Sequence, residues 1–290
     1  MPIRLLSFGE VLFDCFEKSR ELGGAPLNLA AHAALAGAEA YLASAVGDDP
    51  LGDEAIAGIA SLGVRCDLVG RVQNRATGQC LVTLDAGGSP TYNLLDDVAY
   101  DYVTLPEDGE FDVFAFGTLA LRREGNRIAI RRILKTHTFR EVFTDLNIRP
   151  PFFSRESIEI CLNAATIVKI SDEELPTVCE VLFGEVLPLE SAIARILAAY
   201  PGIRLLLLTQ GERGSVCYRE GRRYEMAITP APAISTVGAG DSFGATFLVH
   251  YLGGEDIPTA LAAASAVAAF VVSHRGAVPD GIRELLASLK

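Results

Sequence analysis

Short apolar runs alternate with helix-forming stretches along most of the 290-residue chain. Residues 3–8 predict a buried strand, and an alanine-rich helix is expected over residues 28–37. Residues 39–46 repeat the strand pattern before a predicted amphipathic helix over residues 53–62. Because this spacing is typical of parallel βαβ units, we predict an α/β fold, a three-layer sandwich with a mostly parallel central sheet. No interdomain linker is evident, so residues 1–290 are expected to form a single domain.

Residues 69–103 depart from this alternation. The segment 79–85 alternates with period two, residues 87–90 (Gly-Gly-Ser-Pro) predict a hairpin turn, and residues 91–95 predict a second strand. Antiparallel hairpins can leave one face in solvent, so we interpret this stretch as part of a small β-sheet lid that stands off the main body. The lid is expected to consist of insertions at about 12–22 and 72–103.

The regular alternation resumes after residue 103. Strands are expected at residues 113–116, 141–145, 167–170, 204–209 and 215–218, and helices at residues 126–136, 154–164 and 189–199. Polar side chains follow several of these strands and the first one, namely Glu10, Asn147 with Arg149, Ser171 with Glu174, and Thr209. Ligands of open parallel sheets bind outside the carboxyl ends of the strands. Each residue alone could be a solvated loop residue, but their shared placement favours one site.

A small-residue loop, Gly238-Ala239-Gly240-Asp241, precedes an apolar run near the end of the chain. The glycines permit a sharp turn, and the residues after them predict a helix through Tyr251. The unpaired N–H groups and the positive end of such a helix favour an anion, and a carboxylate beside them can accept a proton from a hydroxyl group. Taken alone, the pattern is more typical of a tight turn with Asp241 as an ordinary helix cap.

Two other kinds of phosphate-binding loop are excluded by the sequence. No Gly-Lys-Ser/Thr follows a glycine loop, so a Walker-type site is absent. Gly244 stands one residue too late for the dinucleotide-binding fingerprint, and the loop lies at the wrong end of the chain for it.

The composition limits which classes of binding partner and which cellular location are expected. With 25 basic and 37 acidic residues the chain has a net charge of −12, which argues against nucleic acid or an anionic membrane surface as a partner. The N-terminal residues are too few and too acidic for a signal peptide, and the apolar stretch 260–273 is too short to span a bilayer. Six cysteines without a Cys-x-x-Cys pair predict core thiols in a reducing, cytoplasmic environment.

Two long segments carry a family resemblance. Residues 23–30 (Gly-Gly-Ala-Pro-Leu-Asn-Leu-Ala), extended through residues 46–52, and residues 236–243 (Thr-Val-Gly-Ala-Gly-Asp-Ser-Phe) resemble signature segments of the ribokinase-like carbohydrate kinases, most closely those of fructokinases. The likeness runs from Phe8 to Ala277. It implies a ribokinase-like fold and ATP-dependent transfer of the γ-phosphoryl group to a primary hydroxyl of a neutral sugar. Fructose, giving fructose 6-phosphate, is the favoured substrate.

The resemblance also implies catalytic roles for matching residues. Asp241 matches the general base, and the anion hole around the transferred phosphoryl group matches Gly238, Ala239 and Gly240. Arg149 resembles the cation near the phosphates. These assignments suit phosphoryl transfer, which needs in-line positioning and neutralisation of charge more than covalent help. A sugar hydroxyl is a poor nucleophile, so a carboxylate within hydrogen-bond reach is the expected proton acceptor.

Binding residues are implied in the same way. The sugar contacts would be Asp14, Gly24, Asn28, Tyr92 and Asn147. The nucleotide contacts would be Lys169, Thr209, Gly211, Gly214, Ser265 and His274. Glu174 matches the glutamate that organises the water shell of a magnesium ion, so ATP and Mg²⁺ are the implied cofactors.

Three features depart from the family pattern. Ser235 stands where the family usually has an aspartate that helps to bind a monovalent cation, which argues against activation by K⁺. Ser265 stands where relatives often carry asparagine. The lid segment 92–97 lacks an arginine common in relatives and ends in Asp96 and Asp97. Both properties of this segment favour a neutral sugar over an acid such as 2-keto-3-deoxygluconate.

Other interpretations remain open at this point. The nearest is a kinase of the same family for another sugar, such as 2-keto-3-deoxygluconate or ribose. A catalytically silent sugar- or nucleotide-binding protein on the same fold is the second, although such a protein has no use for a base at Asp241. An exposed edge expected in residues 79–95, together with family habit, predicts a homodimer formed through the lid sheets.

Overall fold

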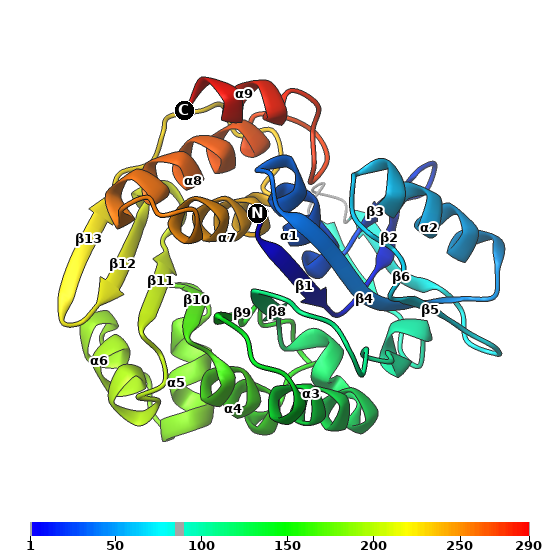
Figure 1. Cartoon of the computed structure of the whole chain (residues 1–290), viewed down its shortest axis with the longest axis horizontal. Coiled ribbons are helices and arrows are strands. Elements are labelled where there is room, and N and C mark those ends of the chain that lie inside the picture. Colours follow the sequence, from blue (N-terminus) through cyan, green and yellow to red (C-terminus); the bar gives the residue numbers. More distant parts are fainter. Residues whose placement is uncertain (1, 85–89, 290) are drawn as a thin grey trace.

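The computed structural model describes residues 2–84 and 90–289. Within these residues nine strands form the main sheet (Figure 1), in the order β13 (Arg222–Met226), β12 (Ser215–Arg219), β11 (Leu205–Thr209), β10 (Ile167–Ser171), β9 (Glu141–Asp145), β8 (Val113–Phe116), β1 (Arg4–Phe8), β4 (Glu39–Gly47) and β5 (Val69–Val72). All neighbours from β11 to β5 run parallel, while β12 and β13 add an antiparallel edge. The predicted α/β class with a mostly parallel sheet is confirmed.

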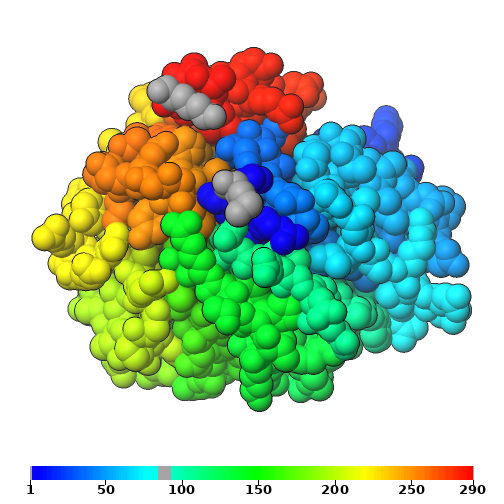
Figure 2. Space-filling model, in the orientation of Figure 1, coloured from blue at the N-terminus to red at the C-terminus, as the bar shows by residue number. Residues whose placement is uncertain are grey.

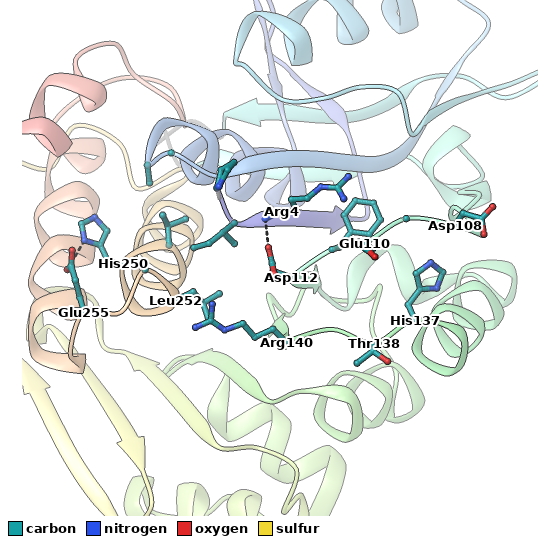
Figure 3. Close-up of a pocket in the computed structure, with 18 of the residues that line it drawn as sticks. Arg4, Asp108, Glu110, Asp112, His137, Thr138, Arg140, His250, Leu252 and Glu255 are labelled. Carbon is teal, nitrogen blue, oxygen red and sulfur yellow. Dashed lines mark hydrogen bonds and ion pairs between the residues drawn. The ribbon is translucent and has the colours of Figure 1, made fainter.

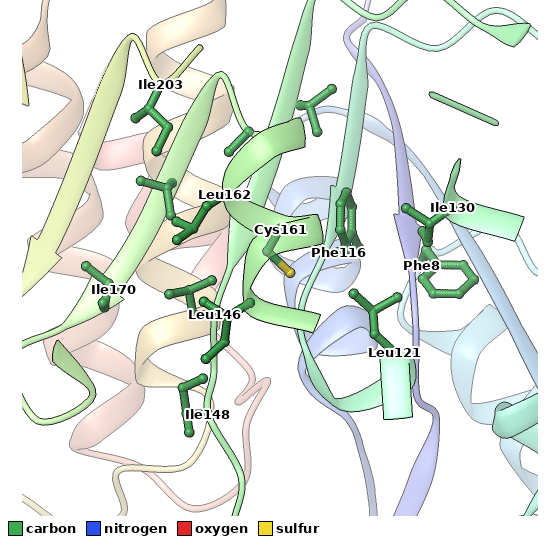
Figure 4. Close-up of a cluster of buried hydrophobic side chains, with 14 of the residues drawn as sticks. Phe8, Phe116, Leu121, Ile130, Leu146, Ile148, Cys161, Leu162, Ile170 and Ile203 are labelled. Carbon is green, nitrogen blue, oxygen red and sulfur yellow. The ribbon is translucent and has the colours of Figure 1, made fainter. Parts of the chain in front are cut away.

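Helices cover both faces of this sheet. One side carries α1 (Ala25–Leu35), α2 (Pro50–Ser61), α7 (Ala239–Leu252), α8 (Ile257–Val272) and α9 (Ile282–Ser288), and the other carries α3 (Glu124–Thr136), α4 (Arg155–Ala164), α5 (Leu175–Phe183) and α6 (Leu189–Ala199) (Figure 1). Successive strand residues point to opposite faces, so Leu5 packs with the first helix layer and Leu6 with the second. Figure 4 shows the second core, where Cys161 and Leu162 of α4 lie among strand side chains. The three-layer sandwich is therefore confirmed.

A second, smaller sheet stands beside the main one. Its strand order is β3 (Arg20–Gly23), β2 (Leu12–Cys15), β6 (Gly78–Leu84) and β7 (Pro90–Leu94). β2 and β6 run parallel, and the two outer pairs are antiparallel. In Figure 2 the atoms coloured light blue to cyan lie on one side of the molecule. The predicted turn at residues 87–90 falls almost entirely outside the described residues.

The stretch 69–103 also contributes to the main body. β5 pairs with β4 at the edge of the main sheet, because Ser44 and Val69 are in register. A 3₁₀ helix at Ala99–Tyr102 buries Tyr100 completely against the small sheet. The sequence analysis does not predict strand β13. Most of its residues are charged, and only its pairing with β12 defines it as a strand.

Two expectations about the core can be compared with the structure. The apolar stretch 260–273 lies in α8, with Ser273 as the cap at its C-terminus, and the helix is largely buried against α7. Across residues 2–84 and 90–289, no helix has both the length and the apolar character needed to cross a membrane. All six cysteines carry free thiols, and four of them, Cys80, Cys161, Cys179 and Cys217, are buried.

Gly78 provides a test of how closely the small sheet is packed. A Cβ atom at this position would stand 2.6 Å from the Val11 carbonyl oxygen and 2.7 Å from the Tyr100 ring. We expect Gly78→Ala to lower the free energy of unfolding by about 1–3 kcal/mol, measured by urea denaturation. Gly125→Ala, where α3 leaves open space, is the control and should change stability by less than about 1 kcal/mol. Equal effects at both positions would contradict the packing described.

Candidate active site

The glycine loop forms the N-terminus of α7. Gly238 caps the helix with a left-handed backbone, φ 80°, which glycine adopts without strain. A Cβ atom there would stand 2.7 Å from atoms of Ala277, so the close approach of the two segments also requires glycine. Because Gly238 supplies the cap, the helix begins at Ala239, earlier than a cap at Asp241 would give. The Asp241 side chain therefore lies in the first turn and does not serve as the cap.

Asp241 is held from a distant helix. Asn28 of α1 donates a hydrogen bond from Nδ2 to Oδ2 of Asp241 over 2.8 Å. Asn28 is buried, and its position depends on Gly24, the residue that precedes α1. Gly24 has φ 113°, and a Cβ atom there would stand 2.5 Å from the Glu10 carbonyl oxygen. The structure thus brings the predicted base together with a predicted sugar-binding residue.

A buried ion pair lies beside the glycine loop. Lys169 of β10 and Asp145 of β9 are register partners, and Lys169 Nζ donates a hydrogen bond to Asp145 Oδ2 over 2.7 Å. Nζ also lies 3.1 Å from the point where a Cβ atom of Gly240 would stand. Burial lowers the pKa of Lys169, but the carboxylates of Asp145, Glu174 and Asp241 together outweigh burial, so the pKa is raised overall. A charged ammonium group therefore lies next to the loop.

Glu174 fixes the segment that carries Asn147 and Arg149. Its Oε1 accepts a hydrogen bond from the Ile148 backbone N–H over 2.6 Å. Its Oε2 accepts from the backbone N–H and the hydroxyl group of Ser171, both over 2.8 Å. Asn147 has a left-handed backbone, φ 41°, at this turn. The residue predicted to organise Mg²⁺ thus holds the backbone between Asn147, a predicted sugar contact, and Arg149, the predicted cation near the phosphates.

A small cavity of about 20 Å³ lies between the strand ends and α7, enough for about one water molecule. Its polar lining comes from Ser7, Glu10, Thr118, Asp145, Asn147 and Asp241. Burial raises the pKa of Glu10 to about 7, and the neighbouring Asp241 carboxylate adds to the rise. Burial likewise raises the pKa of Asp145 to about 6 although Lys169 opposes it, and it raises the pKa of Asp241 although Asn28 opposes it.

Arg149 lowers the pKa of carboxyl groups on both sides of the candidate site. Burial raises the pKa of Asp14, a half-buried residue of β2, whereas Cys80 and Arg149 lower it. Arg149 also opposes the effect of burial on the pKa values of Asp241 and Glu10. Its own side chain is exposed. Arg149 can therefore reach an anion at the mouth of the site while it limits the repulsion among the carboxylates.

The remaining predicted residues belong to other elements than Asp241. Thr209, Gly211 and Gly214 form the end of β11 and the turn into β12. Ser265 of α8 lies 3.3 Å from the Thr229 backbone nitrogen, and His274 stacks on Phe270 with ring centroids 4.1 Å apart. Their nucleotide contacts stay predictions. Tyr92 is in β7, but its side chain falls outside the described part of the structure.

The sequence places Glu10 among the polar residues at the strand ends without a specific role, and it does not single out Asp145. The only sequence signal for Glu10 is a carboxylate directly after an apolar strand and Gly9. Asp145 and Lys169 are each a charged residue in an apolar strand, and only the register of β9 with β10 shows that they form a pair. Asp145 is 8% exposed and Lys169 is 5% exposed. Because both are buried, the loss of either partner would leave the other as an uncompensated charge in the interior.

A much larger cavity lies elsewhere (Figure 3). It has a volume of about 1120 Å³ and is lined at the amino-terminal edge of the main sheet by residues such as Arg4, Asp112, Arg140 and His250. The Arg4 backbone N–H donates a hydrogen bond there to Asp112 Oδ2, and a hydrogen bond joins the side chains of His250 and Glu255. None of the predicted site residues lines this cavity. Chemistry, not cavity size, identifies the candidate site.

The donor set suits phosphate groups better than a directly bound metal ion. Across the described ranges, no group of three or more His, Cys, Asp and Glu side chains could hold a metal ion. The helix N-terminus, Lys169 and Arg149 instead supply positive charge at one place. Both Glu174 oxygens already accept hydrogen bonds, which suits contact with metal-bound water rather than direct ligation. The residues therefore fit ATP with Mg²⁺ held mainly by the phosphates.

Glu10 gives a pH-dependent prediction for stability. Its folded-state pKa of about 7 lies above the usual value of 4.5, so between these pH values the folded chain holds a proton that the unfolded chain releases. Stability contributed by Glu10 is therefore lost as the pH rises through this window. We expect the stability gain of Glu10→Gln to grow from near zero at about pH 4 to about 3 kcal/mol at about pH 8.

The measurement is urea denaturation of both chains across this pH range. Glu107→Gln, at a side chain that is 81% exposed, is the control for a general effect of removing one negative charge. An equal gain for Glu10→Gln at both ends of the range would contradict the burial of a proton-binding Glu10.

Comparison with known proteins identifies the family of this chain. Residues 3–283 match the model of the pfkB family of carbohydrate kinases. A sugar kinase of Pyrococcus horikoshii is 28% identical, over 94% of this chain and 91% of that protein. A fructokinase of Klebsiella pneumoniae is 30% identical, over 83% of this chain and 80% of that protein.

Solved structures show the same fold. The Pyrococcus horikoshii sugar kinase in complex with ATP matches with a TM-score of 0.77 at 25% identity, over 94% of this chain and 93% of that one. A fructokinase of Vibrio cholerae bound to fructose, ADP and calcium matches with a TM-score of 0.84 at 20% identity, over 99% and 98% of the two chains. The chain therefore belongs to the pfkB family of carbohydrate kinases and is an ATP-dependent sugar kinase.

Proposed function

We propose that this enzyme transfers the γ-phosphoryl group of ATP to a primary hydroxyl of a neutral sugar, with fructose to fructose 6-phosphate as the favoured reaction. The observation that carries the proposal is the hydrogen bond from Asn28 to Asp241 at the N-terminus of α7. It holds a carboxylate beside the loop amides, where an acceptor hydroxyl and a terminal phosphate would meet. Fructokinases among the relatives support the choice of fructose.

In this mechanism Asp241 acts as the general base. It takes the proton from the sugar hydroxyl while that oxygen attacks the γ-phosphorus, and the bond from phosphorus to the β–γ bridging oxygen breaks to release ADP. Burial raises the pKa of Asp241, which makes the carboxylate a stronger proton acceptor than an exposed one. Asn28 orients the carboxylate by donating to one of its oxygens.

Charge on the transferred group is neutralised from several directions. The backbone amides at Gly238, Ala239 and Gly240 and the dipole of α7 would face the phosphoryl oxygens. Lys169 lies next to this loop, and Arg149 would approach from the solvent side. Mg²⁺ supplies further positive charge to the phosphates when it is bound, and Glu174 would hold its water molecules. We propose no requirement for K⁺, because Ser235 offers a hydroxyl group where a carboxylate would be needed.

Sugar binding is proposed at Asp14, Gly24, Asn28, Tyr92 and Asn147. The expectation that Asp96 and Asp97 repel an acidic sugar is weakened by the fold. Asp96 forms an ion pair with Arg123 over 2.9 Å, and Asp97 forms one with Arg75 over 3.2 Å. The proposal of a neutral sugar therefore depends mainly on the named relatives and on the absence of the lid arginine. A kinase for 2-keto-3-deoxygluconate or another sugar is the alternative.

The reaction is tested with a sugar panel, ATP and Mg²⁺ in an assay coupled to ADP release. We expect fructose to give the highest kcat/KM and Asp241→Asn to lower kcat by about 10²–10⁴-fold, because the amide cannot accept the proton. Asp256→Asn, at the cap of α8, is the matched control and should leave kcat unchanged. Full activity in Asp241→Asn would refute the mechanism, and preference for an acidic sugar would refute the substrate.

We also propose a homodimer formed through the small sheets. β3 and β7 are the edge strands of this sheet, and Leu81 on β6 is 39% exposed. We expect the native chain to sediment as a dimer at micromolar concentration and Leu81→Lys to shift it toward the monomer, because a charge would be buried in the interface. Ile128→Lys, on exposed α3, is the control and should not change the oligomeric state. A monomeric native chain would exclude the dimer.

A further inference from the structure

His32 is a buried polar residue that the proposed chemistry leaves without a role. It lies on α1, four positions after Asn28, so the two side chains share one helix face. The residue is 1% exposed, and its Nε2 lies 2.8 Å from the carbonyl oxygen of Ala277. Ala277 belongs to the loop that follows α8, at a separation of 245 residues along the chain.

The contact defines the state of the imidazole ring. A carbonyl oxygen can only accept, so Nε2 must carry the hydrogen and donate it to Ala277. Burial lowers the pKa of His32 to about 4, although the bond to Ala277 opposes this, so the ring is neutral at neutral pH. Its Nδ1 is buried and has no hydrogen-bond partner among the described residues. The ring therefore makes one directed hydrogen bond and leaves its other polar atom unsatisfied.

Ala277, whose carbonyl group accepts the hydrogen bond from His32, packs closely against Gly238, the cap of α7. The Cα, Cβ and carbonyl oxygen atoms of Ala277 all lie 2.7 Å from the point where a Cβ atom of Gly238 would stand. No space is left for Gly238 to move toward Ala277. A change in the position of Ala277 would therefore be passed on to the Gly238 peptide and to the loop amides that follow it.

One face of α1 thus supports both parts of the reaction site. Asn28 donates to the Asp241 carboxylate, and His32 donates to the segment that backs Gly238. We propose that His32 is a positioning residue for the anion hole. The His32 N–H group holds the Ala277 carbonyl and so keeps the Gly238 backbone in the conformation that the reaction needs. The proposal rests on the proposed function of the Gly238–Gly240 amides.

A purely structural role is the alternative. In that case His32 would only tie α1 to the loop after α8, and its loss would lower stability without changing the chemical step. The two roles are separated by kcat and by the affinity for a planar phosphoryl mimic, aluminium fluoride, in the presence of ADP and sugar. Such a mimic occupies the place of the transferred group, so its affinity reports the anion hole itself.

His32→Gln and His32→Asn form a matched pair. Both bring a neutral amide of similar polarity, but only the longer glutamine places an N–H group near the position of the histidine Nε2. We expect His32→Asn to lower kcat and aluminium fluoride affinity by roughly tenfold or more, with the KM for sugar and the Kd for ADP within about twofold. His32→Gln should retain kcat within about threefold of the native enzyme.

Equal kcat values for His32→Asn and the native enzyme, or equal losses in the two amide variants, would overturn the proposal. If the histidine variants fail to fold, Ala277→Gly decides, because it removes the methyl group that backs Gly238 and keeps the carbonyl. A several-fold loss of kcat supports the proposal and an unchanged kcat overturns it. Asp241→Asn in the same assay identifies a failure of the proposed mechanism separately, since that variant would then stay active.

Discussion

One hydrogen bond joins the two halves of the site. Asn28 and Asp241 are 213 residues apart in sequence, and the 2.8 Å bond between them requires α1 and α7 to lie side by side on one face of the main sheet. The helices make extensive contact, with small residues such as Ala30 and Ala31 buried on α1. Small side chains let helix backbones approach closely, so the composition of α1 directly serves the position of the carboxylate.

Several buried carboxyl groups lie together at the site, close to two cations. Glu10, Asp145 and Asp241 line one small cavity, and burial raises the pKa of each. Lys169 and Arg149 are the nearby cations that limit this cost. Such an arrangement disfavours folding but prepares the site for an anionic substrate and for proton transfer, a common compromise where function and stability compete.

Glycine residues decide how closely the segments around the reaction site approach. Gly24 lets α1 begin against the Glu10 carbonyl, and Gly238 lets the cap of α7 touch Ala277. Both have positive φ values, 113° and 80°, so any other residue would meet strain as well as collision. The same close approach makes Gly238 sensitive to the loop that His32 holds.

The sequence by itself determined the α/β class, the small second sheet and the glycine loop followed by Asp241, because these depend on local periodicity and on motifs of adjacent residues. The strands over residues 113–116 and 141–145 were predicted with their observed bounds. Only the tertiary structure revealed the Lys169–Asp145 pair, the burial of Glu10 and the bond from His32 to Ala277. These depend on strand register and helix docking between distant segments, and periodicity within one segment carries no information about which partner it will meet.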